Sequence, residues 1–189
     1  MKLSKTHKYT ILCEDKLTHC YIRHFLIAQG ISGRKIFPLP LPADGCGEQY
    51  VRQEFPKYLS VLRSKNFDSN VLVVALDADK RALPERKNQL DDACNAADVP
   101  LRSESDRLLV FIPKRNIETW IKYFDGATVN EEEDYAHFLN GHESDCYPAA
   151  EKMATEFSVE NFIFELPSLQ SAHNEYSNLA RMLVSNDKI

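Results

Sequence analysis

Residues 70–80 of the chain read N-V-L-V-V-A-L-D-A-D-K. The run up to Leu76 consists of apolar β-formers without a break, and it stops at Asp77. A strand that helices cover on both faces has this composition, and such strands belong to parallel sheets. The stretch therefore predicts a buried parallel strand with two carboxylates, those of Asp77 and Asp79, at its carboxyl end.

A second strand with a similar ending is predicted near the N-terminus. Residues 8–13, K-Y-T-I-L-C, are rich in β-formers and end abruptly at Glu14. Residues 18–29 then repeat apolar side chains on one helical face, and Gly30 stands where a C-terminal helix cap belongs. Strand, turn and helix make the first half of a βαβ unit.

Further elements are predicted on both sides of residue 70. Residues 34–41 contain two prolines, so they favour a short edge strand or an exit loop. Apolar residues recur at helical spacing over 51–62, where Pro56 should kink or split the helix. Residues 107–112 predict another buried strand, and residues 117–124 predict a short amphipathic helix after it.

The alternation of strands and helices up to about residue 125 favours a three-layer α/β fold. Its central sheet should be mostly parallel, with helices on both faces. We interpret residues 1–125 as this α/β core. Residues 126–189 begin with an acidic and aromatic stretch, typical of an ordered loop or lid, and continue into two predicted helices. Because no linker is visible, we interpret them as a C-terminal loop and helical elaboration of the same domain.

Composition narrows the class of protein. With 189 residues, 43% of them hydrophobic, the chain has the size and content of one globular domain. It carries 23 basic and 28 acidic residues, and this net charge of −5 argues against nucleic-acid binding by bulk electrostatics. The five cysteines lack CxxC spacing, which favours reduced thiols and a cytoplasmic location. No apolar run approaches about 18 residues, so we expect no membrane association.

The strand ends carry the chemistry that the sequence predicts. In an open parallel sheet, ligands bind beyond the carboxyl ends of the strands. Glu14, Asp77 and Asp79 should lie there, and converging carboxylates repel one another unless a proton or cation intervenes. Oxygen ligands suit Mg²⁺ or Mn²⁺ rather than zinc. We therefore expect a divalent-metal site, although Asp79 taken alone is as well explained as a helix cap.

Basic residues accompany these carboxylates. Lys80 follows the paired aspartates, and Lys114 follows the third buried strand; each is open to two interpretations, phosphate contact or a solvated charge. Pro84 suits the first turn of a helix. For Arg86 and Lys87, which come next, solvated charges at a helix start are the favoured interpretation.

The motifs resemble those of a known family. I-L-C-E at residues 11–14 and V-V-A-L-D-A-D-K at residues 73–80 are similar to the TOPRIM domain of topoisomerases, primases and overcoming-lysogenization-defect nucleases. F-I-P-K-R-N-I-E-T-W at residues 111–120 resembles the P-x-x-x-I-E-x-W/F signature of TOPRIM-related proteins in bacterial phage-defence systems. The resemblance covers about residues 8–125 and implies the Rossmann-like TOPRIM form of the three-layer fold.

The resemblance also implies roles. In the TOPRIM family the glutamate acts as general acid or base in strand breakage or nucleotidyl transfer, and the paired aspartates hold Mg²⁺. Glu14 would then be the acid–base group or an additional metal ligand. Asp77 and Asp79 would hold Mg²⁺ or Mn²⁺, with Glu118 as a further ligand.

The activity implied is that of a metal-dependent nuclease that cleaves phosphodiester bonds, with DNA favoured over RNA as substrate. Lys80 or Lys114 would contact the scissile phosphate. TOPRIM defence nucleases are usually coupled to an ATPase, but no G-x-x-x-x-G-K-[ST] motif occurs here, so any ATPase would be a partner chain. Whether the protein forms a homo-oligomer stays an open question.

Two other functions stay open as well. Asp15 follows Glu14 where the family commonly has glycine, which suits an effector or interaction module with little activity alone. A Mg²⁺-dependent phosphohydrolase of small molecules is the last alternative, because paired aspartates also occur in haloacid-dehalogenase phosphatases. In those enzymes, however, the pair follows the first strand and continues into Thr or Val, whereas here it continues into Lys80.

Overall fold

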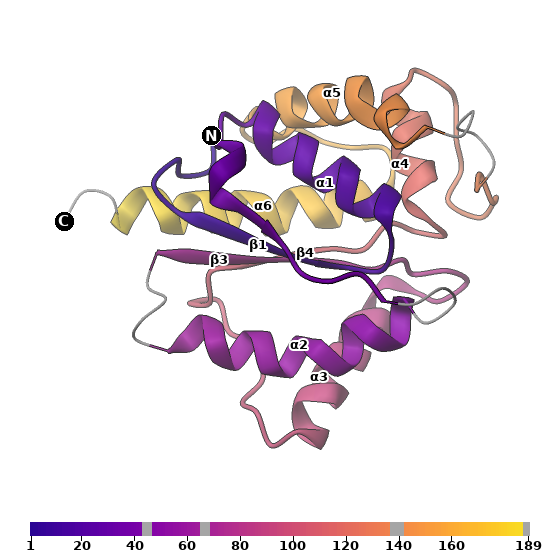
Figure 1. Cartoon of the computed structure of the whole chain (residues 1–189). Coiled ribbons are helices and arrows are strands. Elements are labelled where there is room, and N and C mark those ends of the chain that lie inside the picture. Colours follow the sequence, from indigo (N-terminus) through magenta and orange to yellow (C-terminus); the bar gives the residue numbers. More distant parts are fainter. Residues whose placement is uncertain (43–46, 65–68, 137–141, 187–189) are drawn as a thin grey trace.

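The computed structural model describes residues 1–42, 47–64, 69–136 and 142–186 (Figure 1). In chain order its elements are β1 (Lys8–Cys13), α1 (Lys16–Ala28), β2 (Ile36–Pro38), α2 (Gly47–Arg63), β3 (Asn70–Ala75), α3 (Leu83–Ala96), β4 (Leu108–Phe111), α4 (Ile117–Phe124), α5 (Tyr147–Phe157) and α6 (Pro167–Asn186). Short 3₁₀ turns occur at Gly33–Lys35 and Glu143–Cys146.

The strands form one sheet in the order β2-β1-β3-β4, and every neighbouring pair is parallel. This confirms the predicted three-layer, Rossmann-like α/β fold with a mostly parallel central sheet. The register pairs Cys13 with Ala75, and Ala75 with Phe111, so β1, β3 and β4 end side by side. The residues that follow these three strands therefore meet at one end of the sheet.

Helices cover both faces of the sheet (Figure 1): α1, α4, α5 and α6 lie on one face, and α2 and α3 lie on the other. Alternate residues of β3 point to opposite faces. Val71, Val73 and Ala75 belong to the apolar cluster on the α1 side, while Leu72 and Val74 belong to the cluster on the α2 side. Both sets are buried, which explains why the strand shows no alternation of polar and apolar residues.

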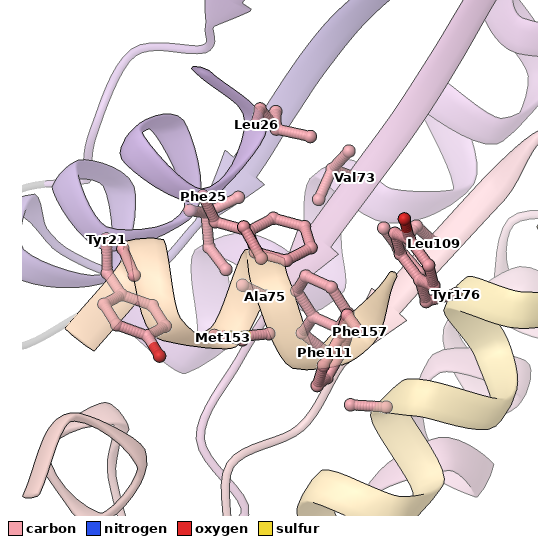
Figure 2. Packing of buried hydrophobic residues seen from close by; sticks show 14 of the residues in the cluster. Tyr21, Phe25, Leu26, Val73, Ala75, Leu109, Phe111, Met153, Phe157 and Tyr176 are labelled. Atoms are coloured by element: carbon pink, nitrogen blue, oxygen red, sulfur yellow. The ribbon is translucent and has the colours of Figure 1, made fainter. Parts of the chain in front are cut away.

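An aromatic cluster connects the C-terminal helices to the sheet (Figure 2). Between ring centroids, Phe25 of α1 lies 5.7 Å from Phe111 of β4 and 5.6 Å from Phe157 of α5, both edge to face. Tyr176 of α6 lies 5.5 Å from Phe157. Such pairs add about 0.5–1.5 kcal/mol each beyond the energy of burial. Helices α5 and α6 thus complete the core that packs on the sheet.

Pro56 lies inside α2. The sequence predicts that this residue kinks or splits the helix, and the helix is not split, because a single helix runs from Gly47 to Arg63. Proline removes one backbone hydrogen bond from a helix interior. Val51, Phe55 and Leu59 are fully buried on the same helix, and their packing against the sheet offsets that loss.

Two smaller observations concern the rest of the chain. In the parts that the structure describes, no helix combines the length and the apolar character that crossing a bilayer requires. The cysteines at positions 13, 20, 94 and 146 carry free thiols, whereas Cys46 lies outside the described residues.

Candidate active site

Glu14 and Asp77 follow neighbouring strands and touch each other. The backbone N–H of Asp77 donates a hydrogen bond of 2.9 Å to Oε1 of Glu14. Strands β1 and β3 are paired up to their last residues, so the residue after Cys13 lies beside those that follow Ala75. The two acidic motifs that the sequence analysis singled out are therefore joined by direct contact.

The start of α2 packs against the same glutamate. A Cβ atom placed on Gly47 would lie 2.8 Å from Cβ of Glu14 and 2.9 Å from its backbone oxygen. Real Cβ atoms essentially never approach other atoms so closely, so any larger residue would push α2 away from the strand end. The sequence shows Gly47 only as part of a turn, and nothing in the pattern indicates this contact.

Asp77 has a carboxylate oxygen without a partner. Its Oδ1 is buried and accepts no hydrogen bond from any residue that the structure describes. Burial raises the pKa of Asp77 well above its usual value, and the negative charges of Glu14 and Asp15 raise it further. Leaving a buried polar atom unsatisfied is unfavourable, so this oxygen is ready to accept a proton or bind a cation.

Glu14 and Glu118 share this electrostatic environment. Burial raises the pKa of Glu14 to about 7, although the hydrogen bond from Asp77 and the charge of Arg86 oppose the shift. Burial likewise raises the pKa of Glu118, in the first turn of α4, to about 7. The charge of Glu118 in turn contributes to the raised pKa of Asp77, so Glu118 lies within electrostatic reach of the pair.

Asp79 lies in a strained turn and does not cap the following helix. Its backbone is left-handed, with φ of +53°, and so is that of Arg115, with φ of +68°. The N–H of Asp79 donates to the carbonyl of Arg115 at 3.1 Å, which joins the loops that follow β3 and β4. Helix α3 has Ala82 as its N-cap, so helix capping by Asp79 is excluded. Non-glycine residues in such conformations cluster at functional sites.

Arg86 corrects an expectation. The favoured interpretation of this residue was a solvated charge, but its side chain is fully buried. It donates to Oδ2 of Asp79 at 2.7 Å and forms an ion pair with Glu48 of α2. Lys87 is also partnered, by an ion pair of 2.9 Å with Glu175 of α6. The sequence pattern places Arg86 near the start of a helix but does not show that this position faces the site.

A hollow of about 590 Å³ opens beside Asp79. Its lining combines cationic, acidic and neutral side chains: Glu48, Asp79, Lys80, Arg81, Glu85, Arg115, Asn116 and Asp134. Lys114 is not one of the residues that line the hollow. Its ammonium group donates to the carbonyl of Arg81 at 2.8 Å and so holds the loop that carries Lys80 and Arg81.

The acidic stretch after α4 reaches this hollow too. Asp134 accepts a hydrogen bond of 2.8 Å from Asn116, and Glu131 accepts one of 2.9 Å from the backbone N–H of Ser168 at the start of α6. Composition favours a simple solvated loop for residues 131–134, and residues 132–134 are indeed exposed in a loop, with these hydrogen bonds in addition. Asp15 caps α1 by accepting from the N–H of Thr18 at 2.8 Å.

The arrangement is a set of carboxylates close to one another without a preformed cage. Among the described residues, no three His, Cys, Asp or Glu side chains are gathered closely enough to hold a metal ion as they stand. The donor set nevertheless fits a hard divalent cation, since it offers only oxygen atoms and includes the unpartnered Oδ1 of Asp77.

Comparisons with known proteins add no family to this description. The chain has no significant match among protein-family models, curated proteins or solved structures. A functional proposal therefore depends on the geometry of the strand ends and on the motifs that lie there.

Proposed function

We propose that this protein is a metal-dependent nuclease of the TOPRIM type, which cleaves phosphodiester bonds in nucleic acid. One observation carries the proposal: Glu14 and Asp77 are in contact at the ends of adjacent parallel strands, and a buried oxygen of Asp77 has no partner among the described residues. Ligands of open parallel sheets bind at this end of the strands.

In this proposal, Asp77 and Asp79 hold Mg²⁺ or Mn²⁺, with Glu118 as a further ligand. A bound divalent ion would stabilise the negative charge that develops on a phosphate during cleavage. Because the described carboxylates do not enclose an ion in their present positions, the proposal includes rotation of their side chains on binding.

Glu14 is proposed as the group that transfers the proton. Its pKa is raised by burial to about 7, and efficient general acid–base groups have pKa values near the working pH. The N–H of Asp77 holds one carboxylate oxygen of Glu14 in a fixed place. That contact orients the glutamate toward the strand ends, where a phosphate would lie.

The hollow beside Asp79 is proposed to hold the substrate phosphate. Lys80, Arg81 and Arg115 line it, and their charges complement an anionic backbone. Lys114 supports this group by holding the backbone of Arg81. Because the protein has a net charge of −5, its binding of DNA must depend on these local cations. We therefore include in the proposal a partner chain, such as an ATPase, that helps to hold the DNA.

The proposal is tested by incubating plasmid and single-stranded DNA with the protein in Mn²⁺ or Mg²⁺. Asp77→Ala and Asp79→Ala should each abolish cleavage. Asp92→Ala is the matched control, because it removes an exposed aspartate from α3 and should leave the rate unchanged. Equal cleavage by the wild-type protein and Asp77→Ala would overturn the proposal. Metal binding without any cleavage would favour the effector module that acts through a partner.

A further inference from the structure

Arg86 is a buried cation within a group of acidic residues. Its side chain is fully inaccessible, on the face of α3 that also buries Leu90 and Cys94. Burying a guanidinium group is strongly unfavourable unless its charge and its N–H donors are matched by partners. The role of the buried Arg86 side chain can therefore be inferred from the residues that it bonds.

The partners of Arg86 come from three parts of the chain. One terminal nitrogen donates to Oδ2 of Asp79 at 2.7 Å, and the other donates to Gln89 of α3 at 2.9 Å. Glu48, at the start of α2, forms an ion pair with the terminal nitrogen of Arg86 that also bonds Gln89, and it pairs with Arg52 at 3.1 Å. Nε of Arg86 has no hydrogen-bond partner among the described residues. Arg86 thus connects the turn after β3 to both helices on that face of the sheet.

This connection restrains a side chain that little else holds. The side chain of Asp79 is 61% exposed and sits in a left-handed turn. A carboxylate in that position would otherwise rotate about its side-chain bonds, and ordering it on ligand binding would have an entropic cost. The bond from Arg86 holds one oxygen, so the direction of the other oxygen is also set.

We propose that Arg86 is a positioning residue, which holds Asp79 by one carboxylate oxygen so that the other is directed to a divalent cation. This inference rests on the proposed function, since it assumes that Asp79 is a cation ligand. Partners that hydrogen-bond the ligands of metal sites orient those ligands, and their loss typically weakens metal binding about 10–100-fold.

The variant Arg86→Lys tests whether the hydrogen-bonding geometry of Arg86, rather than its positive charge alone, is needed for metal binding. Lysine keeps the positive charge but lacks the planar fork that bonds two partners at once. If Arg86 positions Asp79, calorimetric titration should show Mn²⁺ binding to Arg86→Lys weakened about 10–100-fold relative to wild type. In cleavage assays, the Mn²⁺ concentration for half-maximal rate should rise by a similar factor, while the rate at saturating Mn²⁺ should change less.

Arg63→Lys is the matched control. Arg63 also forks a carboxylate, donating to both oxygens of Asp106 at 2.8 and 2.7 Å, but that pair lies next to the start of β4, away from the candidate site. Its loss should lower the urea midpoint without changing Mn²⁺ affinity. A urea titration of every variant reports whether the protein is folded. If Arg86→Lys does not fold, Glu48→Gln replaces it, because this change loosens Arg86 without altering Asp79.

The outcomes separate two failures. If the wild-type protein does not bind Mn²⁺, the proposed function fails, and the inference fails with it. If the wild-type protein binds Mn²⁺ and a folded Arg86→Lys or Glu48→Gln binds it equally well or more tightly, the proposed function survives and the positioning role is overturned. Weaker binding in these variants, with unchanged binding in Arg63→Lys, supports the inference.

Discussion

Asp77 illustrates how a single residue can work against the stability of its fold. It follows a strand that is buried on both faces, and its Oδ1 is buried with no partner among the described residues. Burial raises the pKa of Asp77 well above its usual value, so the folded state binds a proton more readily than the unfolded state does. The stability that this group contributes is present below its unfolded pKa and is lost as the pH rises through its folded pKa.

Asp77→Asn is therefore expected to stabilise the metal-free protein at neutral pH. The substitution keeps the shape of the side chain and removes a buried charge that four neighbouring carboxylates repel. We expect the free energy of unfolding to rise by roughly 1–3 kcal/mol at pH 7.5, measured by urea titration. The gain should shrink as the pH falls toward 4. A lower urea midpoint for Asp77→Asn at pH 7.5 would contradict this account.

At the scale of elements, the site depends on how closely α2 approaches β1. The first residue of α2, Gly47, leaves no space for a Cβ atom next to the backbone of Glu14. Helix α2 also supplies Glu48, which pairs with Arg86. The position of this helix therefore controls two residues of the candidate site.

Gly47→Ala tests this approach. The added methyl group would meet three atoms of Glu14 at 2.8–3.2 Å, two of which belong to the backbone, so α2 or the strand end must shift. We expect a loss of about 1–3 kcal/mol in stability together with lower Mn²⁺ affinity. Gly33→Ala is the control, because its nearest new contact is the mobile end of Arg23 at 3.2 Å. A Gly47→Ala protein as stable as Gly33→Ala would show that the close approach is not needed.

A second element-level contact sets the stability of the protein in acid. Burial opposes the ionisation of Asp106, but hydrogen bonds from Arg63 at the end of α2 and from Ser103 outweigh it, and the pKa lies below its usual value. The pair therefore contributes stability above pH about 4 that is lost as the pH falls through the folded pKa. Arg63→Met should lower the urea midpoint at pH 6 by more than at pH 3. Equal losses at both values would contradict this assignment.

At the scale of the whole molecule, the C-terminal helices share one core with the sheet. Phe157 of α5 and Tyr176 of α6 pack with Phe25 and Phe111 in the aromatic cluster (Figure 2). Without α5 and α6, these rings would face water on one side of the sheet. The region that resembles TOPRIM, about residues 8–125, is therefore only part of the structural unit.

Removal of residues 126–189 is expected to prevent folding. The truncated chain would lose the packing partners of Phe25 and Phe111, and only α1 and α4 would remain on that face of the sheet. The apolar area that these two helices bury is too small to offset the conformational entropy lost on folding. Near-ultraviolet circular dichroism and thermal unfolding should show no fixed aromatic packing and no cooperative transition. A cooperative transition in the truncated chain would show that the C-terminal region is dispensable.

The sequence allowed the strand ends to be predicted, but not the groups that surround them. The apolar run ending at Asp77 and the strand ending at Glu14 each predict a carboxylate at one end of the sheet, because parallel register brings such ends together. Arg86 could not be found in this way, since a charged residue near a helix start is usually solvated. Its burial depends on Glu48 and Asp79, which are distant in sequence and meet it only in the folded chain.

The same limit applies to Gly47 and Asp134. The contact of Gly47 with Glu14 joins residues from separate elements, and no local pattern reports it. Asp134 belongs to an exposed acidic stretch, and composition does not show that Asn116 holds it beside the hollow. The surroundings of Gly47 and Asp134 depend on contacts between residues far apart in the sequence. The strands, in contrast, can be predicted from the pattern of apolar residues within one segment.

The most direct test of the central claim is cleavage of plasmid DNA in Mn²⁺ by the wild-type protein and by Asp77→Asn, side by side. The wild-type protein should cleave only when Mn²⁺ is present, and Asp77→Asn should not cleave at all. Because Asp77→Asn is expected to be the more stable of the two, its inactivity could not be attributed to unfolding. Cleavage by Asp77→Asn at the wild-type rate, or cleavage by the wild-type protein in excess chelator, would contradict the account.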